Sequence, residues 1–366
     1  MRDSSQNWYL VFLMLLAIVL LPGIASGAPC ATATSACTEW VTVAGGPSRV
    51  LIYRTYSIAT RNENVTRALI MIHGSARDAD NYFRTALAAA FLAGALDDSI
   101  VIAPRFAANN VGTNCQDMLA PNELSWYCEP HPDDWRYGGT AVGREAISTF
   151  DVIDETLRLL ARKDFFPNLR AIVVAGHSGG GSFTARYQAV NTIHEGLNVA
   201  TTYVAANPAS YIYLDAVRPT AAAYPVAAGA PGFVPPPPKD AFVQFRGSTT
   251  CGGFDTWPYG TRGRRGGSAR VTDDLLKKQL FARPINYLVG SLDILPLANF
   301  DDSCAAMAQG PTRMARALAF SKYLNEKYSV RHETTIVALC GHNVRCMFTA
   351  DPVLPLIFPK EDVVAR

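Results

Sequence analysis

The stretch most suited to chemistry is Gly176-His177-Ser178-Gly179-Gly180, in which a serine is surrounded by small residues. It follows the apolar run 171–175, which is typical of a strand buried on both faces of a parallel sheet. Residues 182–190 behind it are predicted to form a helix. A serine in such a sharp strand-to-helix turn presents its hydroxyl at the sheet edge as a nucleophile, in a strained backbone conformation. The alternative is a glycine-rich loop that only connects the two elements.

A serine hydroxyl needs a base that takes its proton and an acid that orients the base. In the chain order serine, acid, histidine, only His332 and His342 lie far enough behind the serine. Residues 334–339 are predicted to form a strand. His332 would then precede this strand, whereas His342 follows it, at the carboxyl end where parallel sheets bind ligands. We therefore predict His342 as the base; the alternative is a histidine in a surface loop.

The acid should follow the preceding strand, which we place at residues 284–290. Asp293 comes directly after this strand and is the predicted acid. Asp301 and Asp302 are the competing candidates, because a longer loop could deliver either of them. A solvated aspartate in a turn is the alternative interpretation of all three.

An acyl-transfer site also needs two backbone N–H groups that stabilise the negatively charged oxygen of the intermediate. Gly179, the residue after the nucleophile, is expected to provide one. Ser75 is expected to provide the other, because His73-Gly74-Ser75 ends the predicted strand 68–72. His73 is predicted to have a structural role in this turn. The alternative is an ordinary turn at the end of a strand.

With these pieces in order, the chain resembles the α/β-hydrolase superfamily, and more closely a group of secreted α/β-hydrolases from bacteria and fungi. The resemblance extends from about residue 69 to residue 348. Beyond the serine motif, it rests on the segments His73-Gly74, Asn207-Pro208-Ala209-Ser210-Tyr211, Trp257-Pro258-Tyr259-Gly260, Asp302-Ser303-Cys304-Ala305-Ala306, Gln309-Gly310, Gly341-His342 and Met347-Phe348.

The resemblance implies an α/β-hydrolase fold and hydrolysis. We expect no cofactor and no metal. We expect a serine hydrolase that cleaves carboxylic esters, with a small-molecule or polymeric ester as substrate. A peptidase or a lactone or polyester hydrolase could use the same residues. A binding protein that has the fold but no activity is a further alternative. Tyr211 and Trp257 are expected to contact the substrate.

The rest of the chain is consistent with one α/β domain over residues 28–366, with a mostly parallel sheet flanked by helices. Residues 28–47 are expected to be irregular, and the Ala/Pro-rich stretch 219–238 an extended insertion that forms part of a lid. The long segment 105–139 contains Trp126 and Trp135, which are predicted either to line a substrate pocket or to form core under the loop. Further predicted strands are 50–56 (antiparallel), 69–72, 99–103 and 199–205, and further predicted helices are 147–160 and 307–323.

The N-terminus resembles a secretory signal peptide. Arg2 is followed by the apolar run 8–21, and Ala25-Ser26-Gly27 fits the pattern of small residues at a cleavage site. We therefore predict a signal peptide over residues 1–27 and a secreted, extracellular protein without a stable membrane anchor. An uncleaved signal anchor is the alternative. The net charge of +2 argues against a nucleic-acid partner.

An even number of cysteines, eight, follows the predicted signal peptide. In a secreted chain this count predicts disulfides, although eight cysteines allow 105 connectivities. None of the spacings is C-x-x-C, so no zinc site is expected. Asn64 begins the sequon Asn64-Val65-Thr66 and is a candidate glycosylation site in a eukaryotic secretory route. For the cysteines, pairing those that are close in sequence gives the candidate disulfides Cys30–Cys37, Cys115–Cys128 and Cys340–Cys346, and leaves Cys251–Cys304 as the fourth.

Overall fold

The computed structural model describes residues 27–110, 113–128, 131–224, 239–297 and 299–360. The predicted signal peptide, apart from Gly27, therefore lies outside the described residues, as does the 225–238 part of the predicted lid insertion. Within the described ranges, no helix combines the length and the apolar character that crossing a bilayer requires.

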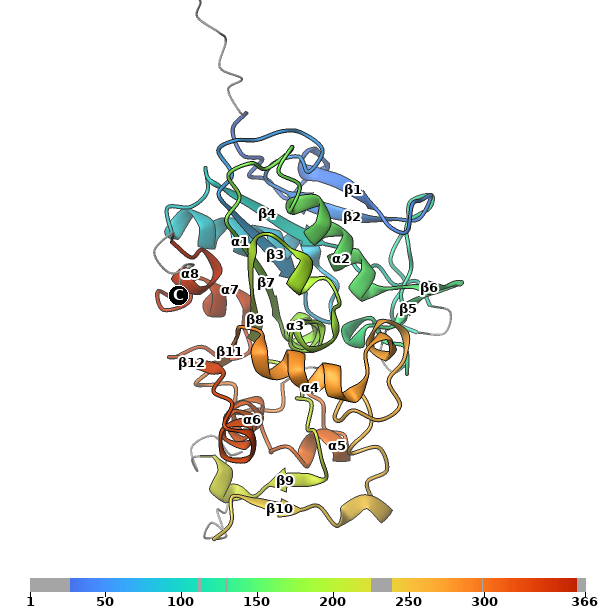
Figure 1. Cartoon of the computed structure of the whole chain (residues 1–366), viewed down its shortest axis with the longest axis vertical. Coiled ribbons are helices and arrows are strands. Elements are labelled where there is room, and N and C mark those ends of the chain that lie inside the picture. Colours follow the sequence, from blue (N-terminus) through green and yellow to red (C-terminus); the bar gives the residue numbers. More distant parts are fainter. Residues whose placement is uncertain (1–26, 111–112, 129–130, 225–238, 298, 361–366) are drawn as a thin grey trace, which may run out of the picture.

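An eight-stranded sheet forms the centre of the molecule (Figure 1). In spatial order its strands are β1 (Thr38–Thr42), β2 (Arg49–Arg54), β4 (Ser99–Pro104), β3 (Arg67–Ile72), β7 (Ala171–His177), β8 (Ala200–Ala206), β11 (Ile285–Gly290) and β12 (Glu333–Val337). The pairs β1–β2 and β2–β4 are antiparallel, and all other neighbours are parallel. The expected mostly parallel sheet is therefore confirmed. Its parallel strands end along one edge, where the side chains that follow them can meet.

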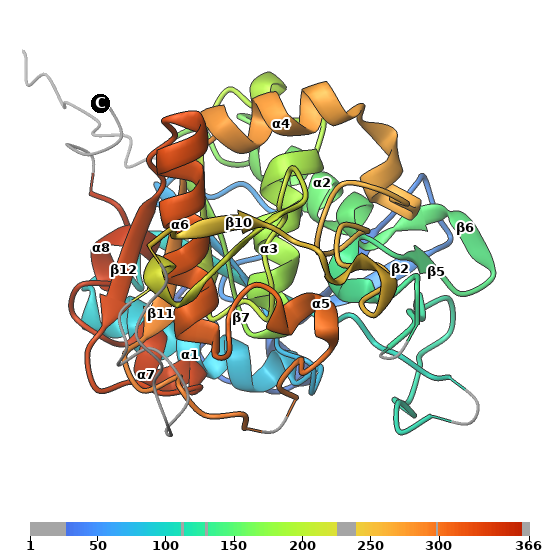
Figure 2. The ribbon, with the colours of Figure 1, turned by 90° about the horizontal axis from the view of Figure 1, so that it is seen from below.

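Helices cover both faces of this sheet, because the side chains of its inner strands are apolar in both directions. In β3, Ile70 packs into one core cluster and Leu69 into the other. Figure 2 shows α1 and α4 on opposite sides of the sheet. The face on which Leu69 lies is covered by α1 (Ala79–Leu92), α7 (Val344–Phe348) and α8 (Leu354–Ile357). The face on which Ile70 lies is covered by α2 (Thr149–Leu160), α3 (Gly179–Val190), α4 (Asp273–Ala282) and α6 (Arg313–Tyr328).

Smaller elements decorate this core. Two antiparallel ribbons lie outside the main sheet, and the short helix α5 precedes α6. They are β5 (Thr140–Ala141) with β6 (Arg144–Ser148), β9 (Val217–Pro219) with β10 (Phe242–Gln244), α5 (Cys304–Met307), and the 3₁₀ helices Ser35–Cys37, Trp135–Tyr137, His194–Gly196, Ala221–Ala223, Gly247–Thr249 and Gly266–Arg270.

Two predictions of secondary structure from the sequence are wrong. The segment 28–47 is not irregular throughout, because it contains β1, an edge strand with mixed burial that lacks the apolar run of the inner strands. The helix expected over 307–323 begins later and ends later, as α6 from Arg313 to Tyr328, and only Met307 of the expected range belongs to the preceding helix α5. The break falls at Gly310-Pro311, where proline cannot donate a backbone hydrogen bond, and Thr312 caps the new helix by accepting from the N–H of Ala315.

All eight cysteines are paired, in the four pairs expected from their order in the sequence. The Cys340–Cys346 bond closes a short loop after β12, and Cys251–Cys304 links segments 53 residues apart.

Buried arginines connect the loops at the carboxyl edge of the sheet through hydrogen bonds to backbone carbonyls. The Arg186 guanidinium donates to the backbone carbonyls of Ser210 (3.1 Å) and Pro258 (2.7 Å). Arg316 donates to the carbonyl of Ala209 at 2.6 Å. Because a guanidinium stays charged, these bonds satisfy buried carbonyls and join segments that are distant in sequence.

Candidate active site

The serine turn has the strained geometry that the sequence predicts. Ser178 lies between β7 and α3 with φ 58° and ψ −116°, a combination that a residue with a side chain rarely adopts. A Cβ on Gly176 would lie 2.3 Å from the carbonyl oxygen of Gly180, and one on Gly180 would lie 2.2 Å from that of Ile72. Only glycine fits at these two positions, so the turn can close and hold the Ser178 hydroxyl at the sheet edge.

Three predicted residues meet at this edge. The Oγ of Ser178 lies 2.9 Å from Nε2 of His342, and Nδ1 of His342 lies 2.9 Å from Oδ2 of Asp293. Since a carboxylate only accepts, Nδ1 carries the proton and Nε2 is free to accept from the serine hydroxyl. This hydrogen-bonded chain is the arrangement in which a base can activate a hydroxyl.

The competing candidates lie elsewhere. Asp301 accepts from the hydroxyl of Tyr259 at 2.8 Å, and Asp302 is exposed. His332 precedes β12, at the opposite end of the strand from His342. The structure therefore brings Asp293, and neither Asp301 nor Asp302, to His342.

Asp293 is held as an anion inside the protein. It has no exposed surface, and burial on its own would raise the pKa of its carboxyl group. Hydrogen bonds from His342 and Asn207 and the positive charge of Arg313 outweigh burial, so the pKa of Asp293 lies below its ordinary value. The Nη1 atom of Arg313 lies 3.5 Å from Oδ1 of Asp293. Oδ2 therefore faces Asn207 and the histidine, and Oδ1 faces the arginine.

Asn207 and Arg313 were not predicted as site residues. Asn207 directly follows β8, so the rule that located Asp293 could have found it. Arg313 opens α6 and reaches Asp293 only through tertiary packing, and no local pattern in the sequence marks it.

The two expected N–H donors lie next to each other. A Cβ on Gly179 would be 3.1 Å from the backbone nitrogen of Ser75. Gly179 is the first residue of α3, so its N–H has no partner within the helix. Both nitrogens therefore lie beside Ser178, where the oxygen of an attacked carbonyl would need them.

His73 has the structural role expected of it. Its ring is fully buried, with Nδ1 2.9 Å from the carbonyl oxygen of Gly74, and Nε2 accepts from the N–H of Phe106 at 2.9 Å. Burial lowers the pKa of His73 to about 4, so the ring is neutral. It fixes the turn that presents Ser75.

A second neutral histidine packs against His342. The ring centroids of His177 and His342 are 4.6 Å apart, and Nδ1 of His177 lies 3.2 Å from the hydroxyl of Tyr82. Burial, and then the charges of His342 and Arg313, lower the pKa of His177 well below its usual value. His177 therefore supports the face of the His342 ring without adding charge.

A shallow, largely polar cavity of about 220 Å³ opens at the Ser178 hydroxyl. Within the described ranges, no cluster of His, Cys, Asp and Glu side chains could hold a metal ion. The cavity is lined by Gly74, Ser75, Ala76, Asp78, Asn81, Tyr82, His177, Ser178, Asn299, His342, Asn343 and Val344.

The aromatic residues predicted to contact substrate lie outside this lining. Trp126 (0% exposed) and Trp135 (1%) are core residues under the loop, and the prediction that they line a pocket is wrong. Both rings pack against Phe106. Tyr211, 1% exposed, is likewise core, with its ring 4.8 Å from that of Phe320. In each case a large ring gains more from burial among other rings than from facing water.

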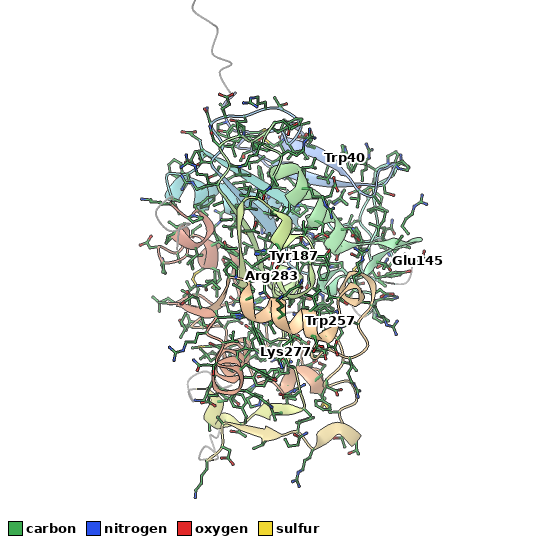
Figure 3. The ribbon with its side chains drawn as sticks, in the orientation of Figure 1. Trp40, Glu145, Tyr187, Trp257, Lys277 and Arg283 are labelled. Carbon is green, nitrogen blue, oxygen red and sulfur yellow. A yellow bond between two sulfur atoms is a disulfide. The ribbon has the colours of Figure 1, made fainter. Side chains whose placement is uncertain are left out.

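Trp257 is only partly buried and is not among the residues that line the cavity. The side chain of Trp257 is labelled in Figure 3. Its Nε1 donates to the carbonyl of Tyr137 at 2.9 Å. This bond fastens the 257–260 segment to the loop that precedes β5.

The family model described as "Alpha/beta hydrolase family" matches residues 69–356. The chain belongs to the alpha/beta hydrolase family. The match covers most of the chain and all of the residues that meet at Ser178, so the fold and family expected from the sequence are confirmed. No match was found among curated proteins.

Two solved structures share the alpha/beta hydrolase fold at low identity. One is the poly(3-hydroxybutyrate) depolymerase LpqC from Bordetella parapertussis, with 19% identity and a TM-score of 0.52, covering 87% of this chain and 88% of that one. The other is poly(aspartic acid) hydrolase-1 from Sphingomonas sp. KT-1, with 16% identity and a TM-score of 0.52, covering 88% and 98%. At these identities the likeness concerns the fold alone.

Proposed function

We propose that this alpha/beta hydrolase is a secreted serine hydrolase that cleaves carboxylic esters through an acyl-enzyme intermediate. One observation carries the proposal: an unbroken hydrogen-bonded chain joins Ser178, His342 and the buried carboxylate of Asp293. Family membership supports hydrolysis as the reaction class.

In the first half of the reaction, Oγ of Ser178 attacks the ester carbonyl while Nε2 of His342 takes the hydroxyl proton. The N–H groups of Ser75 and Gly179 stabilise the negative charge that develops on the carbonyl oxygen. His342 then gives its proton to the alcohol oxygen, and the C–O bond breaks. The products are an alcohol and an acyl ester on Ser178.

In the second half, a water molecule attacks the acyl carbonyl and His342 takes its proton. The same N–H groups stabilise the second intermediate, and the proton returns to Ser178 as the acid leaves. Throughout, Asp293 orients the ring and stabilises the imidazolium. Asn207 and Arg313 act as positioning residues, because they keep that carboxylate ionised and fixed.

Secretion is part of the proposal. It is supported by the predicted signal peptide and by four disulfides, which persist mainly in oxidising compartments. N-terminal sequencing of protein from the culture medium tests it, with a mature chain that begins at Ala28 as the expected result.

The catalytic proposal is tested by a fluorophosphonate probe and a panel of esters of increasing acyl length. The wild-type protein should be labelled, and Ser178→Ala should abolish labelling and lower kcat by a factor of about 10⁴ or more with the fold intact. Labelling that persists in Ser178→Ala would show that another residue is the nucleophile. A wild-type protein that is neither labelled nor active would leave the non-catalytic binding protein as the better interpretation.

A further inference from the structure

The only formally charged side chain that lines the cavity beside Ser178, among the described residues, is an acid. Among the described residues that line it, Asp78 is the only carboxylate, and no lysine or arginine is present. Most of the others offer amides, hydroxyls or imidazoles, and only Ala76 and Val344 are aliphatic. A substrate group in this cavity therefore meets polar partners and a single negative charge.

The Asp78 carboxylate does not cap the backbone of its own helix. Asp78 occupies the N-cap position of α1, yet its side chain makes no capping hydrogen bond. Instead, Oδ2 accepts from the amide nitrogen of Asn81 at 3.0 Å, and Asn81 also lines the cavity. An aspartate at an N-cap would ordinarily accept from the helix backbone, so this arrangement leaves a polar pair on the cavity wall.

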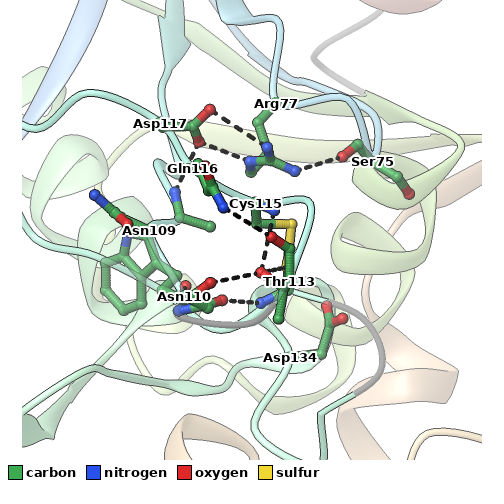
Figure 4. Close-up of a disulfide and its surroundings, with 12 residues drawn as sticks. Ser75, Arg77, Asn109, Asn110, Thr113, Cys115, Gln116, Asp117 and Asp134 are labelled. Atoms are coloured by element: carbon green, nitrogen blue, oxygen red, sulfur yellow. Dashed lines mark hydrogen bonds and ion pairs between the residues drawn. A yellow bond between two sulfur atoms is a disulfide. The ribbon is translucent and has the colours of Figure 1, made fainter.

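Arg77, which precedes Asp78 in the chain, forms an ion pair with a different acid. Figure 4 shows the guanidinium of Arg77 between Asp117 and Ser75. Nε of Arg77 lies 2.7 Å from Oδ2 of Asp117, and Nη1 donates to the carbonyl of Ser75 at 3.1 Å. Arg77 therefore neutralises Asp117 and supports the turn that presents Ser75, while the charge of Asp78 faces the cavity.

We propose that Asp78 makes the enzyme selective for esters that carry a hydrogen-bond donor, a hydroxyl or an ammonium group, near the scissile carbonyl, and makes it discriminate against anionic esters. This inference rests on the proposed ester hydrolysis at Ser178. A half-buried carboxylate attracts a donor and repels a carboxylate more strongly than a fully solvated one, because less water screens it. Burial also raises the pKa of Asp78, which agrees with its partial removal from water.

The test compares kcat/KM for four 4-nitrophenyl esters of similar size: butyrate, 3-hydroxybutyrate, 4-aminobutyrate and hemisuccinate. The wild-type protein should prefer the hydroxyl and ammonium esters and disfavour hemisuccinate. Asp78→Asn should raise kcat/KM for hemisuccinate and lower it for the aminobutyrate, each by roughly threefold to tenfold. The asparagine oxygen still accepts from a hydroxyl, so the hydroxybutyrate rate should change little, whereas Asp78→Ala should lower it.

Asp80→Asn is the matched control. It removes the same charge two residues away, but Asp80 pairs with Arg84 at 2.8 Å and does not line the cavity. Its ester ranking should equal that of the wild type. The contrast between Asp78→Asn and wild type should also shrink at high salt, because salt screens charge. Asp78→Ser, which can cap α1, serves as a second variant if Asp78→Asn unfolds.

Two failures are distinguishable. If the wild type is neither labelled by fluorophosphonate nor active on any ester, the proposed function itself is wrong. If labelling and hydrolysis are normal but the wild type, Asp78→Asn and Asp80→Asn rank the four esters identically, the role of Asp78 is overturned.

Discussion

At the scale of the residue, the surroundings of Asp293 support its proposed role as the acid that orients His342. Its carboxylate is fully buried and contacts His342, Asn207 and Arg313. Asp293→Asn should leave the fold intact but lower kcat by about 10²–10⁴, because the amide favours the wrong histidine tautomer and removes the charge that stabilises the imidazolium. Ester hydrolysis and thermal unfolding of the purified variant measure the two effects separately.

Asp301→Asn is the matched control for this prediction. Asp301 accepts from Tyr259 and from the N–H of Ser303, and does not contact His342. Its kcat should stay within about twofold of wild type, as for a change outside the reacting groups. An inactive Asp301→Asn beside a fully active Asp293→Asn would reverse the assignment.

The sequence predicted Ser178, His342 and Asp293 for one shared reason: each lies within a few residues after a strand that is recognisable from its apolar run. Arg313 and Tyr82 lie on helices, and they reach the site only because those helices pack against the sheet edge. Trp126 was ambiguous, because an aromatic ring in a long loop can line a pocket or fill the core. Tertiary packing determines whether such a ring lines a pocket or fills the core, and the spacing of apolar residues in the sequence does not reveal tertiary packing.

At the scale of the element, the loop after β12 positions His342, the proposed base. The Cys340–Cys346 disulfide encloses His342, and Asn343 caps α7 by accepting from the N–H of Cys346 at 2.9 Å. The double variant Cys340→Ser/Cys346→Ser should lower kcat by up to about 10²-fold, because a shift of about 1 Å in the ring is enough for such a loss. The loss in the free energy of unfolding should be only about 2 kcal/mol, since the closed loop is short.

Cys30→Ser/Cys37→Ser provides the comparison. This disulfide spans 7 residues, against 6 for Cys340–Cys346, and lies in the N-terminal segment away from β12. It should cost a similar free energy of unfolding and leave kcat unchanged. Equal kcat values in the two double variants would show that the bond around His342 has no special part in catalysis.

Elements were predictable where burial makes their pattern simple. The inner strands β3, β4, β7 and β11 are buried along nearly their whole length, and each was located from its apolar run. β1 was missed because it is an edge strand with mixed burial. The division between α5 and α6 was missed because apolar residues continue on both sides of Gly310-Pro311.

At the scale of the whole molecule, stability depends on a buried acid far from the cavity. Asp154 of α2 is 5% exposed and accepts from the Tyr187 hydroxyl at 2.6 Å. Burial raises the pKa of Asp154 to about 6, despite the opposing effect of that hydrogen bond. A raised pKa in the folded state means that the protonated acid stabilises the fold below about pH 4, and that this contribution is lost as the pH rises through about 6.

Asp154→Asn should therefore stabilise the protein at pH 8 by about 1–3 kcal/mol relative to wild type, because the amide cannot ionise and its oxygen still accepts from Tyr187. The gain should disappear near pH 4, where the wild-type carboxyl is protonated. Urea unfolding at both pH values measures this difference. Glu155→Gln, which removes a partly exposed charge that pairs with Arg158 on the same helix, should show no such pH dependence. A gain for Asp154→Asn that is equal at both pH values would contradict the assignment.

The distance in sequence between Ser178 and the proposed base has a consequence for the synthesis of the chain. Ser178 and His342 are 164 residues apart. The strand that precedes the histidine, β12, lies at one edge of the sheet and pairs with β11 alone. A growing chain therefore has its nucleophile in place long before it has a base, and under the proposed mechanism it stays inert until the final strand has joined the sheet. Hydrolysis would then indicate that the chain is completely folded, and the cell that makes the protein would not be exposed to its activity while the chain is still being made.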